Sequence, residues 1–177
     1  MKVNQIITTT RERELGIDGI TLLSVEEYEA YKDIIPRTAC TWWLRSPGVR
    51  SGNAAIVYSD GSASIYGYSV NSGKVAVRPA LELYDLDSSG LQVGDKFNLF
   101  GYNWTVISDV YALCDELLGD LCFRKDSKAE GANLYELSDI RKYINEWLTP
   151  NMWATLEVVG FNGMRMTLEE ARNKRKE

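Results

Sequence analysis

The feature that most limits what this chain can fold into is a two-residue periodicity between residues 42 and 83. Its clearest part, NAAIVYSDGSASIYGYSV, contains two alternating runs joined by SDGS. Successive side chains of a strand point to opposite faces, so this pattern predicts a β-hairpin. The Asp60-Gly61 pair predicts a type I′ turn, in which both central residues have positive φ. A further strand is predicted at VAVRPALEL, where Pro79 lacks an N–H donor and indicates an edge strand or a local end of pairing.

Two other segments have the spacing of helices. Ser24 and Glu27 form an S-x-x-E capping box ahead of VEEYEAYKDI, and Pro36 ends that helix. Ser138 caps a second helix, DIRKYINEWL, whose apolar residues recur at helical spacing and predict one face packed on the core. That stripe consists of Ile140, Tyr143, Ile144, Trp147 and Leu148. Shorter strands are predicted at GITLLS, at KFNLFG and YNWTVIS around a turn at Gly101, and at TLEVVGF. Strands and helices together predict a mixed α+β fold.

The composition excludes several kinds of chemistry. The chain has no histidine, which removes Ser-His-Asp and Cys-His catalysis and histidine-based metal sites. Cys40, Cys114 and Cys122 are an odd number without the spacing of a metal site, and catalysis by one of them is the weakest interpretation. Neither a metal nor another cofactor is therefore expected, and a non-enzymatic protein is the favoured reading.

Charge and hydropathy indicate the expected cellular location of the chain and the kind of partner it binds. The net charge of −5 disfavours direct nucleic-acid binding and is compatible with a basic partner. No apolar run approaches the roughly 20 residues that span a bilayer. Residues 1–16 lack the apolar core of a signal peptide, so the expected location is the cytoplasm.

The segment TACTWWLRSPG raises the main question about binding. As a strand it would direct Trp42 and Leu44 to one face and Trp43 and Arg45 to the other, which is consistent with packing in a core. The alternative is an exposed aromatic and arginine patch, which is typical of an interface hot spot or a sugar-binding platform. The tyrosines of the hairpin, with serine and glycine between them, extend that patch and resemble a paratope. The candidate partner-binding residues are Trp43, Arg45, Tyr58, Tyr66 and Tyr68.

Several motifs resemble those of an uncharacterised domain family common in gut Firmicutes, their phages and mobile elements. LLSVEEYEAY, WWLRSPG, the hairpin with its Asp-Gly turn and VRPALEL resemble the C-terminal half of that domain. VGDKFNLFGYNWTVIS and NLYELSDIRKYINEWL resemble its N-terminal part. The two halves therefore stand in reversed order along this chain. The residues that the motifs mark as structural are Trp42, Arg78, Pro79, Trp104, Ser138, Asp139 and Arg141.

The reversed order leaves two interpretations of the domain organisation. In both, residues 17–84 and 91–166 are the two halves of a single domain, 85–90 (DLDSSG) is the linker, and 167–177 is a charged C-terminal helix. A circular permutation would bring the halves together within one chain. A swapped dimer would complete each core with a second chain. The permuted monomer is favoured, because the short linker suffices for neighbouring elements.

The resemblance implies a C-type-lectin-like fold, with a twisted antiparallel sheet and two or three helices. It also implies a protein encoded by a phage or mobile element. Together with the acidity and the missing catalytic residues, this favours an inhibitor that binds a host defence nuclease such as a Cas effector, an anti-CRISPR type of activity. The alternative is a lectin-like domain that binds carbohydrate or another surface ligand. Fold alone does not decide between them.

Overall fold

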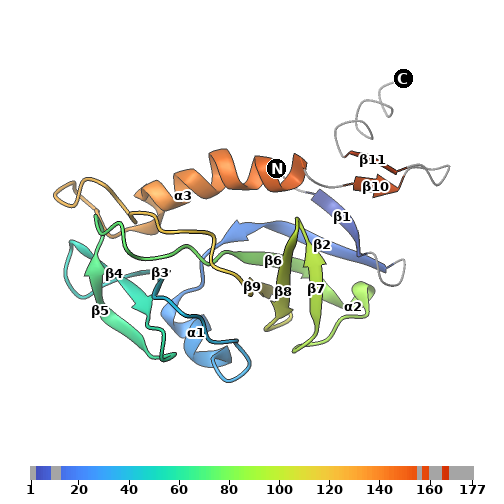
Figure 1. The fold of residues 1–177 in the computed structure, drawn as a ribbon, viewed down its shortest axis with the longest axis horizontal. Coiled ribbons are helices and arrows are strands. Elements are labelled where there is room, and N and C mark those ends of the chain that lie inside the picture. The colour runs from blue at the N-terminus through green and yellow to red at the C-terminus, as the bar shows by residue number, and fades with distance from the viewer. Residues whose placement is uncertain (1–2, 9–12, 155–156, 160–164, 168–177) are drawn as a thin grey trace.

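A computed structural model describes residues 3–8, 13–154, 157–159 and 165–167 of the chain. The fold is mixed α+β with antiparallel sheets, as predicted (Figure 1). The strands are β1 (Val3–Thr8), β2 (Arg13–Thr21), β3 (Trp42–Pro47), β4 (Asn53–Val57), β5 (Ala63–Ser69), β6 (Ala80–Asp85), β7 (Lys96–Leu99), β8 (Tyr102–Val106), β9 (Tyr111–Cys114), β10 (Glu157–Val159) and β11 (Arg165–Thr167). The helices are α1 (Val25–Tyr31), α2 (Leu86–Ser89), α3 (Asp139–Tyr143) and α4 (Thr149–Ala154), with a 3₁₀ turn at Tyr135–Leu137 and a π-helical segment at Ile144–Leu148.

Most strands belong to a six-stranded sheet with the order β1-β2-β6-β9-β8-β7. β6 lies in its interior, paired with β2 on one side and β9 on the other. Of the two alternatives for Pro79, the edge strand is therefore wrong and the local end of pairing is confirmed. Pro79 directly precedes Ala80, the first residue of β6, so the missing N–H falls just outside the strand ladder.

The hairpin β4–β5 belongs to a three-stranded sheet with the order β3-β4-β5. The strands are confirmed, but the type I′ turn is wrong, because Gly61 has a positive φ of 86° whereas Asp60 does not. The Tyr58 N–H donates to the Ser62 carbonyl at 2.8 Å, which closes a three-residue loop. Positive φ at both turn residues occurs instead between β7 and β8, at Phe100 (58°) and Gly101 (79°).

The capping box ahead of α1 is confirmed. The Ser24 hydroxyl accepts from the Glu27 N–H at 3.1 Å, and the Ser24 N–H donates to the Glu27 carboxylate at 2.8 Å. The helix ends at Tyr31, several residues before Pro36.

The second predicted helix runs as α3, the π-helical segment and α4, which Figure 1 shows as one continuous rod along the six-stranded sheet. Ile140, Ile144 and Leu148 are buried, but Trp147 is 55% exposed and stacks on Tyr143 at 5.2 Å. The π-helical turn is wider than an α-helical one, so the predicted stripe does not keep its register through Trp147.

Strand β4 and the first half of β3 are buried on both faces, which answers the question about the two tryptophans. Trp42 packs with Leu44, Ala55 and Val57 in one cluster, whereas Trp43 belongs to the larger cluster beneath the six-stranded sheet. Both indole side chains are at most 1% exposed. Alternate side chains of β3 therefore enter two different apolar layers, as expected of a strand that lies between them.

The C-terminal helix is predicted at 167–177, of which 168–177 lie outside the described residues, while Thr167 ends β11. Among the helices of the described ranges, none is long and apolar enough to cross a membrane.

Candidate functional site

Arg45 and Glu27 form a polar junction that holds α1 against β3. Both terminal nitrogens of Arg45 donate to the Glu27 carboxylate, at 2.5 and 2.7 Å, and Nη1 also donates to the Leu22 carbonyl at 2.7 Å. The Tyr111 hydroxyl donates to the same carboxylate at 2.8 Å. Burial on its own would raise the pKa of Glu27, but the donors Arg45, the Ser24 N–H and Tyr111 outweigh it and hold the pKa below its ordinary 4.5. Arg45 therefore serves the fold, with its hydrogen bonds directed inward.

The outer surface of the hairpin exposes a group of apolar and aromatic side chains, here called the tyrosine face. It consists of Val49, Tyr58, Ile65, Tyr66 and Tyr68. Tyr66 is 72% exposed, Ile65 47% and Tyr68 43%. The Val49 N–H donates to the Ile65 carbonyl at 2.8 Å and brings the exposed Val49 to β5. Tyr58 is half-buried, and its ring meets that of Tyr68 edge to face at 6.2 Å.

A bulge in β5 explains why this face is so open. Ala54 pairs with Tyr68 and Ile56 with Ser64. An advance of four residues along β5 therefore lies opposite an advance of two residues along β4. Gly67 lies inside the bulge with a positive φ of 59°. The strict alternation of side chains is lost there, and neighbouring residues can both point to solvent.

The structure separates the five predicted partner-binding residues. Trp43 is excluded from any surface patch, because it is fully buried and its Nε1–H donates to the Leu121 carbonyl at 2.7 Å. Arg45 is engaged with Glu27. Tyr58 and Tyr68 are in ring contact on the hairpin, and Tyr66 is exposed on the same strand as Tyr68. Sequence reasoning missed Ile65 and Val49, because alternation predicts that Ile65 faces away from Tyr66.

Two residues of the VRPAL segment connect the halves of the chain. Arg78 is 1% exposed and lies over the Trp42 ring, 5.0 Å from its centroid. Its Nε–H donates to the Cys114 carbonyl at 2.7 Å, and the Cys114 N–H donates to the Pro79 carbonyl at 3.0 Å. Arg78 therefore connects the two halves through a backbone carbonyl and an aromatic ring.

The motif residues of the second half also have structural contacts. Trp104 is buried and its Nε1–H donates to the Leu99 carbonyl at 2.9 Å. The Ser138 hydroxyl accepts from the Arg141 N–H at 3.0 Å and caps α3. The Asp139 carboxylate accepts from the Lys125 N–H at 2.7 Å. The side chain of Arg141 donates to the Glu136 carbonyl at 3.2 Å on the exposed side of the helix.

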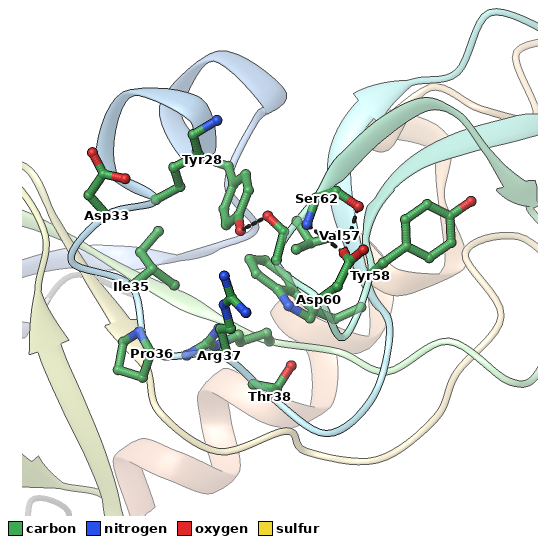
Figure 2. Close-up of a pocket in the computed structure, with 14 residues that line it drawn as sticks. Tyr28, Asp33, Ile35, Pro36, Arg37, Thr38, Val57, Tyr58, Asp60 and Ser62 are labelled. Atoms are coloured by element: carbon green, nitrogen blue, oxygen red, sulfur yellow. Dashed lines mark hydrogen bonds between the residues drawn. The ribbon is translucent and has the colours of Figure 1, made fainter.

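A cavity of about 450 Å³ opens between α1, the segment 35–38 and the tip of the hairpin (Figure 2). The Tyr28 hydroxyl donates to the Gly61 carbonyl at 2.6 Å and connects the helix to the hairpin tip. Figure 2 shows the Arg37 guanidinium pointing between Tyr28 and Asp60. The buried Trp42 and Arg78 also line this cavity. No sequence motif joins these residues, which come from four separate segments.

The cysteines have different environments. Cys40 is exposed, Cys122 is half-buried, and Cys114 is fully buried. Burial raises the pKa of the Cys114 thiol to about 12, which suppresses the reactive thiolate. Within the described ranges, no cluster of three or more histidine, cysteine or acidic side chains could hold a metal ion.

We expect Cys114 to be unreactive in the folded protein. In a Cys40→Ala/Cys122→Ala variant, iodoacetamide at pH 8 should label Cys114 at least about a hundredfold more slowly than in urea, because a thiol of raised pKa that is closed to solvent offers little thiolate. Mass spectrometry of timed samples measures the rate. A variant that keeps only Cys40 is the control and should label at similar rates in both conditions. Equal native and denatured rates for Cys114 would contradict the buried position.

Comparison with protein families finds one match. Residues 9–84 are similar to a family model described as a domain of unknown function (DUF6273). The match includes the capping box, the WLRSPG segment, the hairpin and the VRPAL segment, and it spans less than half of the chain. No curated protein and no solved structure matches the chain.

Proposed function

We propose that this chain is a non-enzymatic protein-binding module whose contact surface is the tyrosine face. The observation that carries this proposal is the exposure of Tyr66, Ile65 and Tyr68 on one short strand. Exposed aromatic side chains with few rotatable bonds are typical of interface hot spots and of paratopes. The edge-to-face contact of Tyr58 with Tyr68 further restricts the rings before binding, which lowers the entropy cost of association.

The partner we propose is a protein with a basic surface. The chain carries a net charge of −5, so long-range attraction would speed its encounter with such a partner. Nucleases that hold nucleic acid in a basic channel fit this description. An inhibitor of a host defence nuclease, encoded by a phage or mobile element, is thus the specific form of the proposal. Direct binding to nucleic acid is not expected of so acidic a chain.

We further propose that the domain is C-type-lectin-like and circularly permuted. Supporting this, β6 of the 17–84 half pairs with β9 of the 91–166 half within the same chain. The linker 85–90 contains the one-turn helix α2 and leads from β6 to β7 of the same sheet. A core completed within one chain favours the permuted monomer over the swapped dimer.

A second candidate function is carbohydrate binding on the same face. The exposure of the Tyr66 ring favours it, since sugars pack their apolar faces on open aromatic rings. A glycan panel therefore belongs in the test of the first proposal.

We expect a Tyr66→Ala/Tyr68→Ala variant to lose partner binding by at least about 30-fold, since a single hot-spot residue contributes about 2 kcal/mol or more. The tagged protein is used in a pull-down from a Firmicutes lysate supplemented with a Cas9–guide complex. The affinity of each variant for the retained partner is then measured. The fold should persist, because both side chains are on the surface.

The matched control is Trp147→Ala, which removes an exposed aromatic ring on the long helix, away from the hairpin. It should bind like the wild type. Wild-type binding by the double tyrosine variant would contradict the assigned face. Retention of a glycan and of no protein would replace the first function with the second.

A further inference from the structure

The cavity at the hairpin tip contains a buried cation with an unused hydrogen-bond donor. Arg78 is 1% exposed, and its Nη2 is a buried atom with no hydrogen-bond partner among the described residues. No carboxylate of the described ranges forms an ion pair with it. Burial lowers the pKa of Arg78 to about 10, so the guanidinium is still charged at neutral pH. A buried charge without a counter-ion is costly, and the cation–π contact with Trp42 offsets only part of that cost.

A second guanidinium faces the same space. Arg37 is exposed at the mouth of the cavity, and none of the described residues accepts a hydrogen bond from it. Figure 2 shows it directed between Tyr28 and Asp60. Asp60 Oδ1 accepts from the Ser62 N–H at 2.8 Å and from the Ser62 hydroxyl at 2.6 Å. These hydrogen bonds lower the pKa of Asp60, and the positive charge of Arg37 adds to the effect, but Arg37 donates no hydrogen bond to the carboxylate. Both arginines thus retain donors for a ligand.

The cavity lining contains cationic groups without an ion pair, although the protein is acidic. Of its three cationic side chains, Lys32 is paired with Glu29 at 2.6 Å, whereas Arg37 and Arg78 form no ion pair with a described carboxylate. The carboxylates of Asp33 and Asp60 also line the cavity. The hydroxyls of Thr38 and Ser62 add polar groups, whereas the Tyr58 hydroxyl points away from the cavity (Figure 2). Guanidinium groups bind carboxylate and phosphate oxygens through paired N–H donors. Its volume of about 450 Å³ is within the range of small-molecule sites.

We propose that this cavity binds a small molecule that carries a phosphate or carboxylate group. Arg78 supplies the buried positive charge, and Arg37 covers the anion from the mouth. This site does not depend on the protein-binding proposal, because its donors, Arg78 and Arg37, are not part of the tyrosine face.

The test uses the full chain and two probes, inorganic phosphate and citrate. Each is titrated separately at constant ionic strength, with binding followed by backbone amide chemical shifts and by calorimetry. We expect saturable shifts around Tyr28, Arg37 and Gly61 with one of the probes. Arg37→Gln should weaken that binding about tenfold, and Arg78→Met, which keeps an unbranched apolar chain over Trp42, should abolish it. Arg50→Gln removes an exposed arginine outside the cavity lining and should bind like the wild type.

The outcomes separate the two ligand chemistries. Saturation with phosphate alone identifies a phosphoryl ligand, and saturation with citrate alone identifies a carboxylate ligand. Shifts that stay linear with both probes, or affinities unchanged in both Arg37→Gln and Arg78→Met, would overturn the proposal. If Arg78→Met fails to fold, Arg37→Gln decides the question, because its side chain is exposed and outside the core.

Discussion

Gly67→Ala is expected to destabilise the protein by about 3 kcal/mol or more, a large effect for one methyl group. Gly67 has a positive φ of 59°, and a Cβ placed there would lie 1.8 Å from the Ala54 carbonyl oxygen. The clashing atom belongs to the backbone of the buried central strand β4, so no side chain can move aside to relieve it. The bulge that opens the tyrosine face therefore requires glycine at this position.

Gly94→Ala is the matched control for this prediction. Gly94 also has a positive φ, 94°, but a Cβ there would meet nothing within 4 Å. This variant should lose only about 1 kcal/mol from backbone strain. Urea denaturation of both variants measures the difference, which is the steric contribution. If Gly67→Ala loses no more free energy of unfolding than Gly94→Ala, the bulge yields to the methyl group and is not a rigid support for the tyrosines.

The elements that sequence reasoning predicted well depend on local interactions. The capping box of Ser24 and Glu27 closes within four residues, and the strands of the hairpin follow from alternation alone. The placement of Trp42 and Trp43 in separate layers follows from the same alternation. Each of these features is determined by neighbours along the chain.

The features that were predicted wrongly depend on distant contacts. The turn at Asp60-Gly61 is held by a distant contact, because the Gly61 carbonyl accepts a hydrogen bond from the Tyr28 hydroxyl, 33 residues away. β6 is an interior strand because β9 pairs with it from the other half. Trp43 is buried because Leu121 and Phe123 cover it. Periodicity carries no information on such partners.

The same reasoning explains why the candidate sites were only partly predictable. Arg45 was predicted as a partner-binding residue, but it binds Glu27 at the start of α1. Arg78 was predicted as a structural residue, and it binds the Cys114 carbonyl of β9. The tyrosine face depends on the bulge at Gly67, and the cavity depends on the approach of α1 to the hairpin tip. Neither feature has a sequence signature that could be read before the fold is known.

Arg45→Ala is expected to lower the free energy of unfolding by about 2–3 kcal/mol, because it leaves the half-buried Glu27 carboxylate without its bidentate partner and frees the Leu22 carbonyl. Arg45→Lys should recover only part of this loss, since an ammonium group cannot reproduce two parallel hydrogen bonds. Lys32→Ala removes an exposed ion pair with Glu29 on the same helix and should change stability by less than about 1 kcal/mol. Urea titrations of the three variants measure their free energies of unfolding and so compare the Arg45–Glu27 pair with the Lys32–Glu29 pair. A loss in Arg45→Ala as small as that in Lys32→Ala would mean that the junction does not stabilise the fold.

The same junction predicts a pH dependence. The pKa of Glu27 in the folded protein lies below its ordinary 4.5, so its contribution is present above that value and is lost as pH falls through the folded pKa. Wild-type stability should therefore decline below about pH 4.5 more steeply than that of Glu27→Gln, which is less stable at pH 7 but has no carboxylate to protonate. Urea denaturation at pH 7, 5, 4 and 3 tests this for both proteins. Parallel declines of the two would show that other carboxylates carry the acid sensitivity and that Arg45 and Tyr111 do not favour the charged form of Glu27.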